Sequence, residues 1–317
     1  MMLWYLQLFK AILCALSKGK APPMPEKTLS SPKLDRLISD ALAMEAQSAQ
    51  EAGTLGFMAR VLVQTTMPHR QQTSNEFTRT NGALTMTMLA PSVTGLPYGS
   101  VPRLLTAWLT TEAVRTKSRE LVMGNSLSDF MRSLDLVPTG GRWGSITRLK
   151  EQSKRLFAAS VSCQYDTAER HDHLNMKIAS KASLWWTPKT PEQAALWQST
   201  VTLDQDFFDE ITSSPVPVDL RALKALKGSP MALDIYAWLT YRMSYLKRPV
   251  SIPWAGLQAQ FGAGYAMTPQ GQSEFKRAFS RHLKKIAAVY PDARVTPDGN
   301  MLRLSPSNTH VKRVGQA

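Results

Sequence analysis

Apolar residues recur in two series that have the same order and spacing along the chain. The tetrapeptide Ala-Trp-Leu-Thr stands at residues 107–110 and again at residues 237–240, an offset of 130 residues. Each copy lies late in an apolar segment with helical spacing, Val101–Arg115 in the first series and Ser229–Tyr245 in the second. The match predicts an internal repeat that begins with a helix in each half of the chain.

After these helices both series continue through the same elements. Each has a strand-like run, an amphipathic segment, a turn rich in Gly and Pro, a basic helix, and strand signals around a polar turn. The first series consists of Arg119–Met123, Ser126–Leu136, Pro138–Gly141, Ser145–Ser160, and Ser160–Tyr165 with Leu174–Trp186. The second consists of Arg248–Ile252, Pro253–Phe261, Gly262–Gly271, Ser273–Val289, and Ala293–Thr296 with Met301–Leu304. This order predicts an α+β fold, mostly helical, with two tandem winged helix-turn-helix domains.

The repeat also predicts domain boundaries. Pro32–Gln50 has helical spacing, Leu84–Leu89 alternates with a period of two, and Thr187–Pro217 contains several prolines and is expected to be a linker. We expect the first winged-helix domain to supply phosphate contacts and a dimer surface, and the second to supply most of the DNA recognition. The predicted ranges are an N-terminal extension at 1–31, the first domain with N-terminal helices at 32–190, and the second domain at 191–317.

The apolar run Met1–Leu16 requires a separate interpretation. It contains Lys10, has no basic residues before the apolar stretch, and is shorter than the roughly 20 residues that a membrane span needs. We expect an upstream extension or a helix that packs on the body of the protein. A helix lying on a membrane surface and an export signal are the alternatives.

Composition narrows the class of partner. Lys and Arg together number 38 against 24 Asp and Glu, which gives a formal net charge of +14. Such an excess favours a polyanionic partner. The two cysteines, Cys14 and Cys163, are too few for a disulfide framework or a four-thiolate zinc site, so we expect a cytoplasmic protein without structural metal or cofactor.

The two basic helices carry the candidate DNA-binding residues. Arg148, Gln152 and Arg155 lie opposite the apolar face of the first helix, and Arg277, Arg281 and Lys284 lie opposite that of the second. A solvated basic face is the alternative for either helix alone. Two such faces in equivalent places favour DNA in the major groove. The complete candidate set is Arg142, Arg148, Gln152, Lys154, Arg155, Lys276, Arg277, Arg281, Lys284 and Lys285.

Other aromatic and glycine-rich features have simpler interpretations. The turn at residues 140–144 would present backbone N–H groups to a phosphate at the start of the first basic helix. Leu105, Trp108, Ile235 and Trp238 are expected to be core residues.

Signals for an enzyme are mostly missing from the sequence. It has neither a P-loop motif nor a dinucleotide-binding fingerprint. His171-Asp172-His173 could belong to a metal-dependent nickase, but we expect this triplet to lie in a turn at the tip of a wing, where two histidines would not form a metal site. The acidic residues from Asp204 to Glu210 are expected to begin a helix. We therefore predict no enzymatic activity and no small-molecule substrate.

Three blocks of the sequence resemble the plasmid-encoded replication initiators of the RepA family. They are Gly56–Gln64 with Met67-Pro68-His69, Gly95–Ser100 with Leu105–Arg115, and Pro138–Arg148. The similarity spans roughly Leu34 to Leu304 and leaves Met1–Met24 outside. The resemblance implies a protein that binds repeated DNA sequences (iterons) at a plasmid origin, promotes local melting, and recruits the host initiator and helicase.

The resemblance also implies an equilibrium between monomers that bind iterons and dimers that repress the protein's own promoter. Two other functions stay open from the sequence. One is a winged-helix transcriptional regulator without replication activity, and the other is a rolling-circle type nickase that uses His171, His173 and a tyrosine.

Overall fold

The computed structural model describes residues 32–185 and 199–311. The chain divides into two compact units, Met1–Arg36 and Leu37–Ala317. In the first unit only residues 32–36 are described, as the beginning of helix α2 (Pro32–Ala46). The predictions for the apolar N-terminal run and for Cys14 concern residues outside the described ranges. All features below belong to the second unit.

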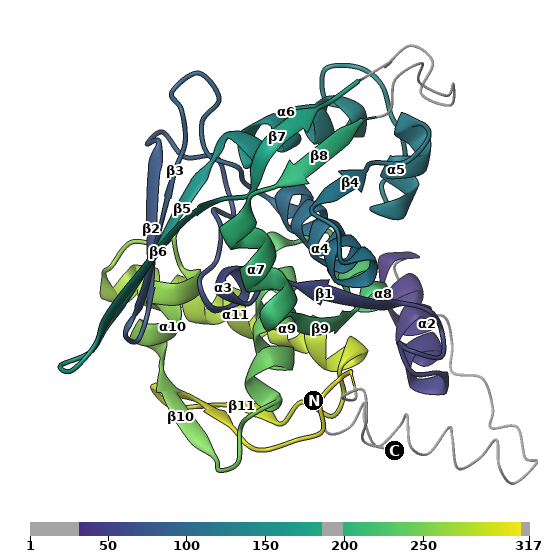
Figure 1. Cartoon of the computed structure of the whole chain (residues 1–317). Helices are drawn as coiled ribbons and strands as arrows, with labels where there is room; N and C mark the ends of the chain where they lie inside the picture. Colours follow the sequence, from purple (N-terminus) through teal and green to yellow (C-terminus); the bar gives the residue numbers. More distant parts are fainter. Residues whose placement is uncertain (1–31, 186–198, 312–317) are drawn as a thin grey trace, which may run out of the picture. The chain divides into compact units, whose positions relative to one another are not determined.

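Two successive sets of elements in this unit have the same order and the same sheet topology (Figure 1). In both, a helix, a short strand and two helices precede two further strands, and the last strand pairs between the other two. The first set comprises α4 (Ser100–Thr116), β4 (Glu120–Val122), α5 (Leu127–Ser133), α6 (Ser145–Ala158), β7 (Ala179–Ser183) and β8 (Thr200–Leu203). The second comprises α9 (Pro230–Met243), β10 (Val250–Pro253), α10 (Trp254–Phe261), α11 (Pro269–Val289), β11 (Val295–Asp298) and β12 (Met301–Leu304). The expected α+β class is confirmed.

The predicted ribbon of the first set is wrong in its strand pairing. The hairpin of β5 (Ser160–Asp166) and β6 (His171–Lys177) does not join β4 but belongs to a four-stranded sheet with β2 (Glu76–Asn81) and β3 (Leu84–Leu89). In β5, Val161 and Cys163 are buried opposite Met88 and Met86 of β3. The local alternation of β5 predicts a strand but not its partner, which lies far away in the sequence.

The expected linker at Thr187–Pro217 is also wrong for its described part. Residues 199–217 include β8, helix α7 (Gln205–Ser213) and the start of β9 (Val216–Asp219), which pairs with β1 (Leu55–Met58). Asp204 is the N-cap residue of α7, as the acidic cluster predicts. Because β8 completes the sheet with β4 and β7, the first set of strands extends past residue 190 to Leu203.

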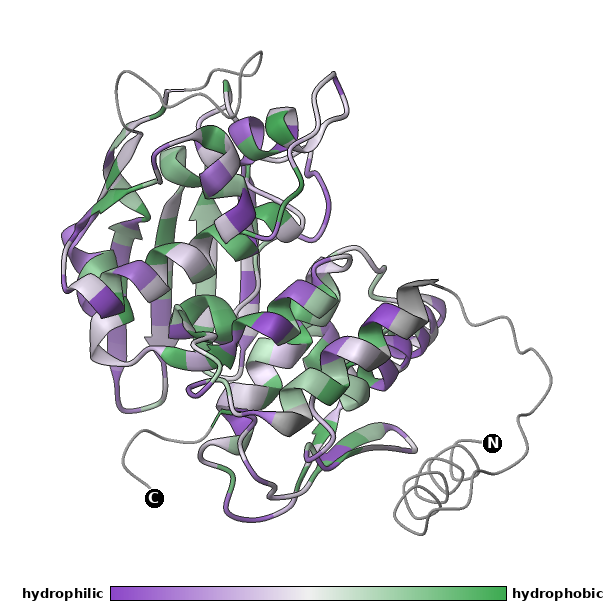
Figure 2. Ribbon diagram, turned by 90° about the vertical axis from the view of Figure 1, so that its right-hand side faces the viewer, coloured by the Kyte–Doolittle hydropathy of each residue, from purple (hydrophilic) through white to green (hydrophobic). Residues whose placement is uncertain are grey.

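The core is continuous across both sets of elements. Leu105 on α4 and Ile235 on α9 are fully buried, Trp238 is buried, and Trp108 is partly buried with its ring edge-on to Phe130 at a centroid distance of 5.0 Å. Short helices α3 (Arg60–Gln64) and α8 (Leu220–Leu226) contribute to the same cluster. Colouring by hydropathy shows apolar and polar stretches alternating along several helices (Figure 2). Helices α4 and α9 are instead buried over most of their length. None of the described helices is long and apolar enough to cross a bilayer.

A buried ion pair connects the two central helices. Arg103 on α4 is 1% exposed, and its Nε and Nη2 donate to the two carboxylate oxygens of Asp234 on α9, each at 2.6 Å. The same guanidinium donates to the main-chain oxygens of Met67, Pro68 and Gly99. The short motifs around residues 67–69 and 95–100 therefore supply backbone acceptors for one buried arginine.

Charged neighbours set the ionisation of this cluster. Burial would raise the pKa of the Asp234 carboxyl, but Arg103 and a hydrogen bond with His69 hold it below its ordinary value. His69 Nε2 lies 2.7 Å from Asp234 Oδ2, and burial lowers the pKa of His69 in spite of that carboxylate. At neutral pH the cluster thus holds an ionised pair and a neutral imidazole.

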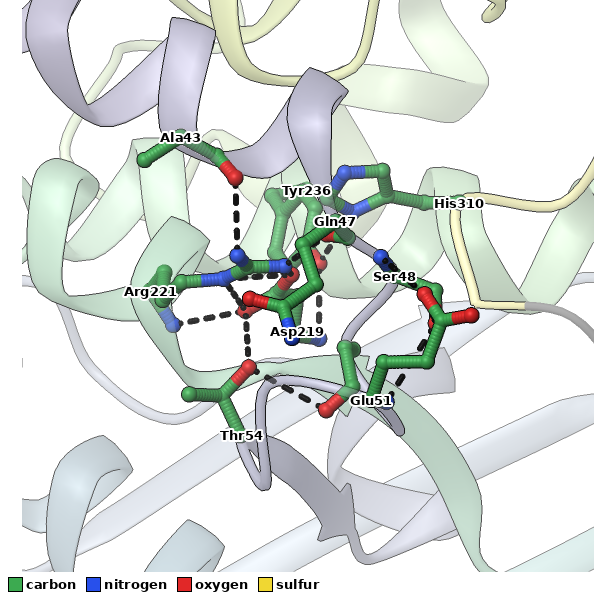
Figure 3. A network of polar contacts seen from close by, with 10 residues as sticks. Ala43, Gln47, Ser48, Glu51, Thr54, Asp219, Arg221, Tyr236 and His310 are labelled. Atoms are coloured by element: carbon green, nitrogen blue, oxygen red, sulfur yellow. Dashed lines mark hydrogen bonds and ion pairs between the residues drawn. The ribbon is translucent and has the colours of Figure 1, made fainter.

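A second network fixes helix α2 and the C-terminal segment to β9 and α9 (Figure 3). Asp219 caps α8 by accepting from Arg221 N at 2.8 Å, and it also accepts from the Arg221 guanidinium. That guanidinium donates to the main-chain oxygens of Ala43 and Gln47 near the end of α2. Asp219 N donates to the hydroxyl of Tyr236, which lies 2.7 Å from His310 Nδ1. These contacts join segments that are distant in the sequence.

Three partly buried histidines indicate that acid destabilises the fold. Burial lowers the pKa of His282 to about 4, and it also lowers the pKa values of His69 and His310. The unfolded chain therefore binds more protons than the folded one as the pH falls from 6.5 towards 4, and stability falls with it. His171 has the opposite sign, because Asp166 raises its pKa, but its side chain is exposed.

We expect His282→Asn to flatten this dependence between pH 6.5 and pH 4. The measurement is the free energy of unfolding in urea at several pH values, with His171→Asn as the control. An unchanged slope in the His282 variant would show that this imidazole is not titrated by unfolding.

Candidate nucleic-acid interface

Helix α11 has an exposed cationic face, and its opposite face packs on buried aromatic side chains. Arg277, Arg281, Lys284 and Lys285 are exposed, as the i, i+4, i+7 spacing predicts. On the opposite face Phe275 and Phe279 are fully buried, and both rings pack near Trp254 of α10, at centroid distances of 6.4 Å and 5.7 Å. The helix begins at Pro269, earlier than expected, because Thr268 caps it. The buried aromatic rings hold the cationic face in a fixed orientation.

The turn between β11 and β12 lies next to this helix. Lys276 Nζ donates to the main-chain oxygen of Gly299 at 2.6 Å and lies 5.5 Å from the centre of the Trp254 ring. Gly299 has a φ of +53°, which the predicted Asp-Gly turn requires. Lys276 therefore fixes the turn to the helix, and its ammonium group is already engaged within the protein.

Helix α6 presents fewer free cations than expected. Arg142, Arg148 and Lys154 are exposed. Gln152 was expected on the outward face but is 4% exposed, and its Oε1 accepts from Tyr98 N at 2.8 Å, so this prediction is wrong. Arg155 is half-buried, donates to Leu96 O at 3.3 Å and lies over the Tyr98 ring. The segment at residues 95–98 packs against this face, which the helical periodicity could not indicate.

The turn before α6 is held by reciprocal hydrogen bonds. Ser145 N donates to Thr139 Oγ1 and Thr139 N donates to Ser145 Oγ, each at 2.9 Å. A Cβ at Gly144 would lie 2.2 Å from Thr139 O, so glycine is required at this close approach. The guanidinium of Arg142 lies 5.2 Å from the centre of the Trp143 ring, and both side chains extend into solvent. The glycine-rich turn thus presents an arginine and an indole on a fixed backbone.

The sequence pattern did not identify further exposed arginines on or beside the sheet of β10, β12 and β11. Arg303 lies on β12 between the buried residues Leu302 and Leu304, so its side chain is on the opposite face of the sheet. Arg248 and Arg294 are exposed just before β10 and β11. The alternation of residues 301–304 is a signal that could have identified Arg303.

The expected place of His171-Asp172-His173 is wrong. The triplet begins strand β6 and is not part of the turn, so both imidazoles lie on one face, with ring centroids 6.4 Å apart. His171 Nδ1 forms a hydrogen bond with Asp166 Oδ1, and the rings of His171 and His173 are both exposed. Among the described residues no group of three or more His, Cys, Asp or Glu is arranged to hold a metal ion. Cys163 is buried on β5, which raises the pKa of its thiol to about 12.

Comparison with solved structures shows a likeness in fold. The chain superposes on a crystal structure of a selenomethionine derivative of domains 2 and 3 of RctB with a TM-score of 0.51 at 8% identity, covering 80% of this chain and 97% of that one. A second crystal structure of RctB domains 2 and 3 gives a TM-score of 0.48 at 8% identity, covering 78% and 96%. No curated protein matches the sequence significantly.

Comparison with protein families gives the identity. The model of the family described as plasmid-encoded RepA protein matches residues 96–254, which contain the first repeated set of elements and the beginning of the second. This match covers half of the chain and agrees with the resemblance seen in the sequence blocks. The chain belongs to the RepA family of plasmid-encoded replication initiators.

Proposed function

We propose that this protein initiates plasmid replication by binding repeated origin DNA, the iterons, sequence-specifically. The observation that carries the proposal is the exposed cationic face of α11, which is held by buried aromatic rings and flanked by the β11–β12 turn. A helix of this kind fits the major groove, with its arginines at base edges and its lysines near phosphates.

We further propose that the two repeated sets are tandem winged helix-turn-helix domains. Their common order of helix, strand, two helices and two strands supports this assignment, as does the shared sheet topology. In each set the last helix before the ribbon, α6 or α11, would be the recognition helix. The first domain would then end after β8 rather than at residue 190.

The two proposed domains differ in the polar and cationic side chains that they can present to DNA. In α6 the amide of Gln152 and the guanidinium of Arg155 are engaged within the protein. The exposed cations of α6 and the preceding turn are Arg142, Arg148 and Lys154, of which Arg148 also donates from Nη2 to Trp143 O at 3.4 Å. In α11, Arg277, Arg281, Lys284 and Lys285 extend outward. This difference supports a second domain that reads bases and a first domain that mainly contacts phosphates.

The family relationship supports the remaining parts of the proposal. The protein would act in the cytoplasm, without a cofactor or a small-molecule substrate, by opening the origin and recruiting the host initiator and helicase. It would also form a dimer, in equilibrium with the monomer, that represses its own promoter through a surface on the first domain.

Salt dependence of DNA binding tests the electrostatic part of this proposal. We expect the logarithm of the association constant to fall with the logarithm of salt concentration with a slope of about −5 or steeper, which corresponds to about six or more phosphate contacts. Fluorescence anisotropy on a labelled duplex from the plasmid origin measures the slope. A slope near zero would rule out DNA as the partner of the cationic faces.

An initiator of this kind requires directly repeated sequences in the origin DNA, and deleting them distinguishes replication initiation from transcriptional regulation alone. If the protein is an initiator, the plasmid is lost when these repeats are removed. If it is a transcriptional regulator without replication activity, the plasmid is maintained.

Incubation of the protein with supercoiled origin DNA and Mg²⁺ tests the nickase alternative. A nickase would produce relaxed circles, and the double variant His171→Ala with His173→Ala would not.

A further inference from the structure

The residue immediately before the N-cap of each basic helix is a large apolar side chain in solvent. Trp143 precedes the N-cap of α6 and is 81% exposed, and Met267 precedes the N-cap of α11 and is 76% exposed. Among the large apolar residues in the described ranges, only Val93 is more exposed. The same unusual feature therefore occurs at the same position of both repeated sets.

Neither side chain has the partner that this position commonly offers. An apolar residue before the N-cap usually packs on the fourth residue of the helix. That residue is Arg148 in α6 and Gln272 in α11, so neither helix provides an apolar surface there. Exposed apolar side chains of this size commonly mark an interaction site.

The backbone next to both side chains is fixed. Reciprocal hydrogen bonds between Thr139 and Ser145 hold the turn that contains Trp143. Beside Met267, Ala266 O accepts from Gln258 Nε2 at 2.9 Å, and Thr268 Oγ1 accepts from Gly271 N at 3.1 Å. Because this backbone is already fixed, little backbone entropy is lost when a partner binds Trp143 or Met267.

The surroundings of both side chains indicate which partner they contact. Arg142 lies over the Trp143 ring, and each residue adjoins a helix with an exposed cationic face. These surroundings favour an anionic partner that also offers apolar groups. Double-stranded DNA does so in the major groove, where thymine presents its C5 methyl group.

We propose that Trp143 and Met267 contact thymine methyl groups, one from each winged helix, and so contribute to sequence selection. The proposal rests on the function proposed above. Residues near the start of a recognition helix face the base edges. Trp143 would therefore give the first domain one apolar base contact, while the cations of that domain mainly contact phosphates.

Thymine-to-uracil replacement tests this proposal, because uracil lacks only the methyl group. The probe is the duplex that the full chain selects from a pool of random sequences, prepared with uracil at one thymine position at a time. We expect the wild-type protein to lose affinity about fourfold at a contacted position, as for the loss of one buried methyl group. Trp143→Ala and Met267→Ala should each bind the thymine duplex about fourfold or more weakly than the wild type does. For each variant, uracil at the position that its missing side chain contacts should cause no further loss of affinity.

Val93→Ala is the matched control, since Val93 is 91% exposed but does not precede a basic helix. It should bind every duplex as the wild type does, and thermal melting should be unchanged in all three variants. Trp143→Phe and Met267→Leu should keep most of the affinity for the thymine duplex.

Several outcomes would overturn the proposal. One is an equal loss for the alanine variants on thymine and uracil duplexes, which would place these side chains on the sugar-phosphate backbone. Another is unchanged DNA binding with lost plasmid replication, which would assign the two side chains to a protein partner. If the wild-type chain selects no sequence from the pool, both the methyl contacts and the proposed sequence-specific function are refuted. If it selects a sequence but uracil has no effect at any position, only the methyl contacts are refuted.

Discussion

Replacing Asp234 by alanine is expected to lower the free energy of unfolding by about 3–5 kcal/mol. The carboxylate is 4% exposed and pairs with both Nε and Nη2 of Arg103, which is 1% exposed. Without it, the guanidinium stays buried without a counter-charge. Urea unfolding monitored by tryptophan fluorescence measures the loss.

Asp172→Ala is the matched control for this measurement. It breaks an ion pair with Arg170 in which both side chains are exposed, and it should change stability by less than about 1 kcal/mol. Arg103→Met should be at least as harmful as Asp234→Ala, because it also leaves the oxygens of Met67, Pro68 and Gly99 without their donor. A loss below 1 kcal/mol in both buried variants would mean that water reaches the cluster.

Replacing Arg281 by alanine should cost about 1–3 kcal/mol in binding to iteron DNA and less on random DNA. Arg281 lies near the middle of the exposed face of α11, and a lost contact to a base edge reduces specificity more than general affinity. Fluorescence anisotropy at one fixed salt concentration, with both duplexes, measures the difference.

Arg148→Ala on α6 is the comparison for this experiment. We expect it to weaken binding to iteron and random DNA by similar factors, because the first domain mainly contacts phosphates. Equal losses on the two duplexes for Arg281→Ala would instead place Arg281 at a phosphate. The assignment of α11 as the helix that selects sequence would then be wrong.

Local patterns were sufficient to predict the elements of the second set and the outward face of α11. The spacing of apolar residues predicts a helix wherever one face is buried, and strand β12 and the preceding Asp-Gly turn follow from alternation and from the backbone freedom of Gly299. Arg277, Arg281 and Lys284 lie opposite phenylalanines that must be buried, so their exposure follows from the sequence alone.

Tertiary contacts decided what periodicity cannot express. Gln152 lies on the polar side of α6 but is buried, because the segment at residues 95–98, distant in sequence, covers that side. Likewise β5 pairs with β3 rather than with a strand of the winged-helix order, and β8, which lies beyond residue 190, pairs with β4 and β7 of the first set. Strand pairing is chosen by the whole sheet and its buried side chains, not by any one strand.

The sequence by itself determined the repeat, the net charge of +14 and the resemblance to the RepA family. Only the tertiary structure showed that Arg103 and Asp234 form a buried pair, that His171 and His173 share a strand face, and that Arg155 contacts Leu96 and Tyr98. A charged residue looks the same in the sequence whether it faces water, DNA or a buried partner. Its environment is created by segments that meet only when the chain folds.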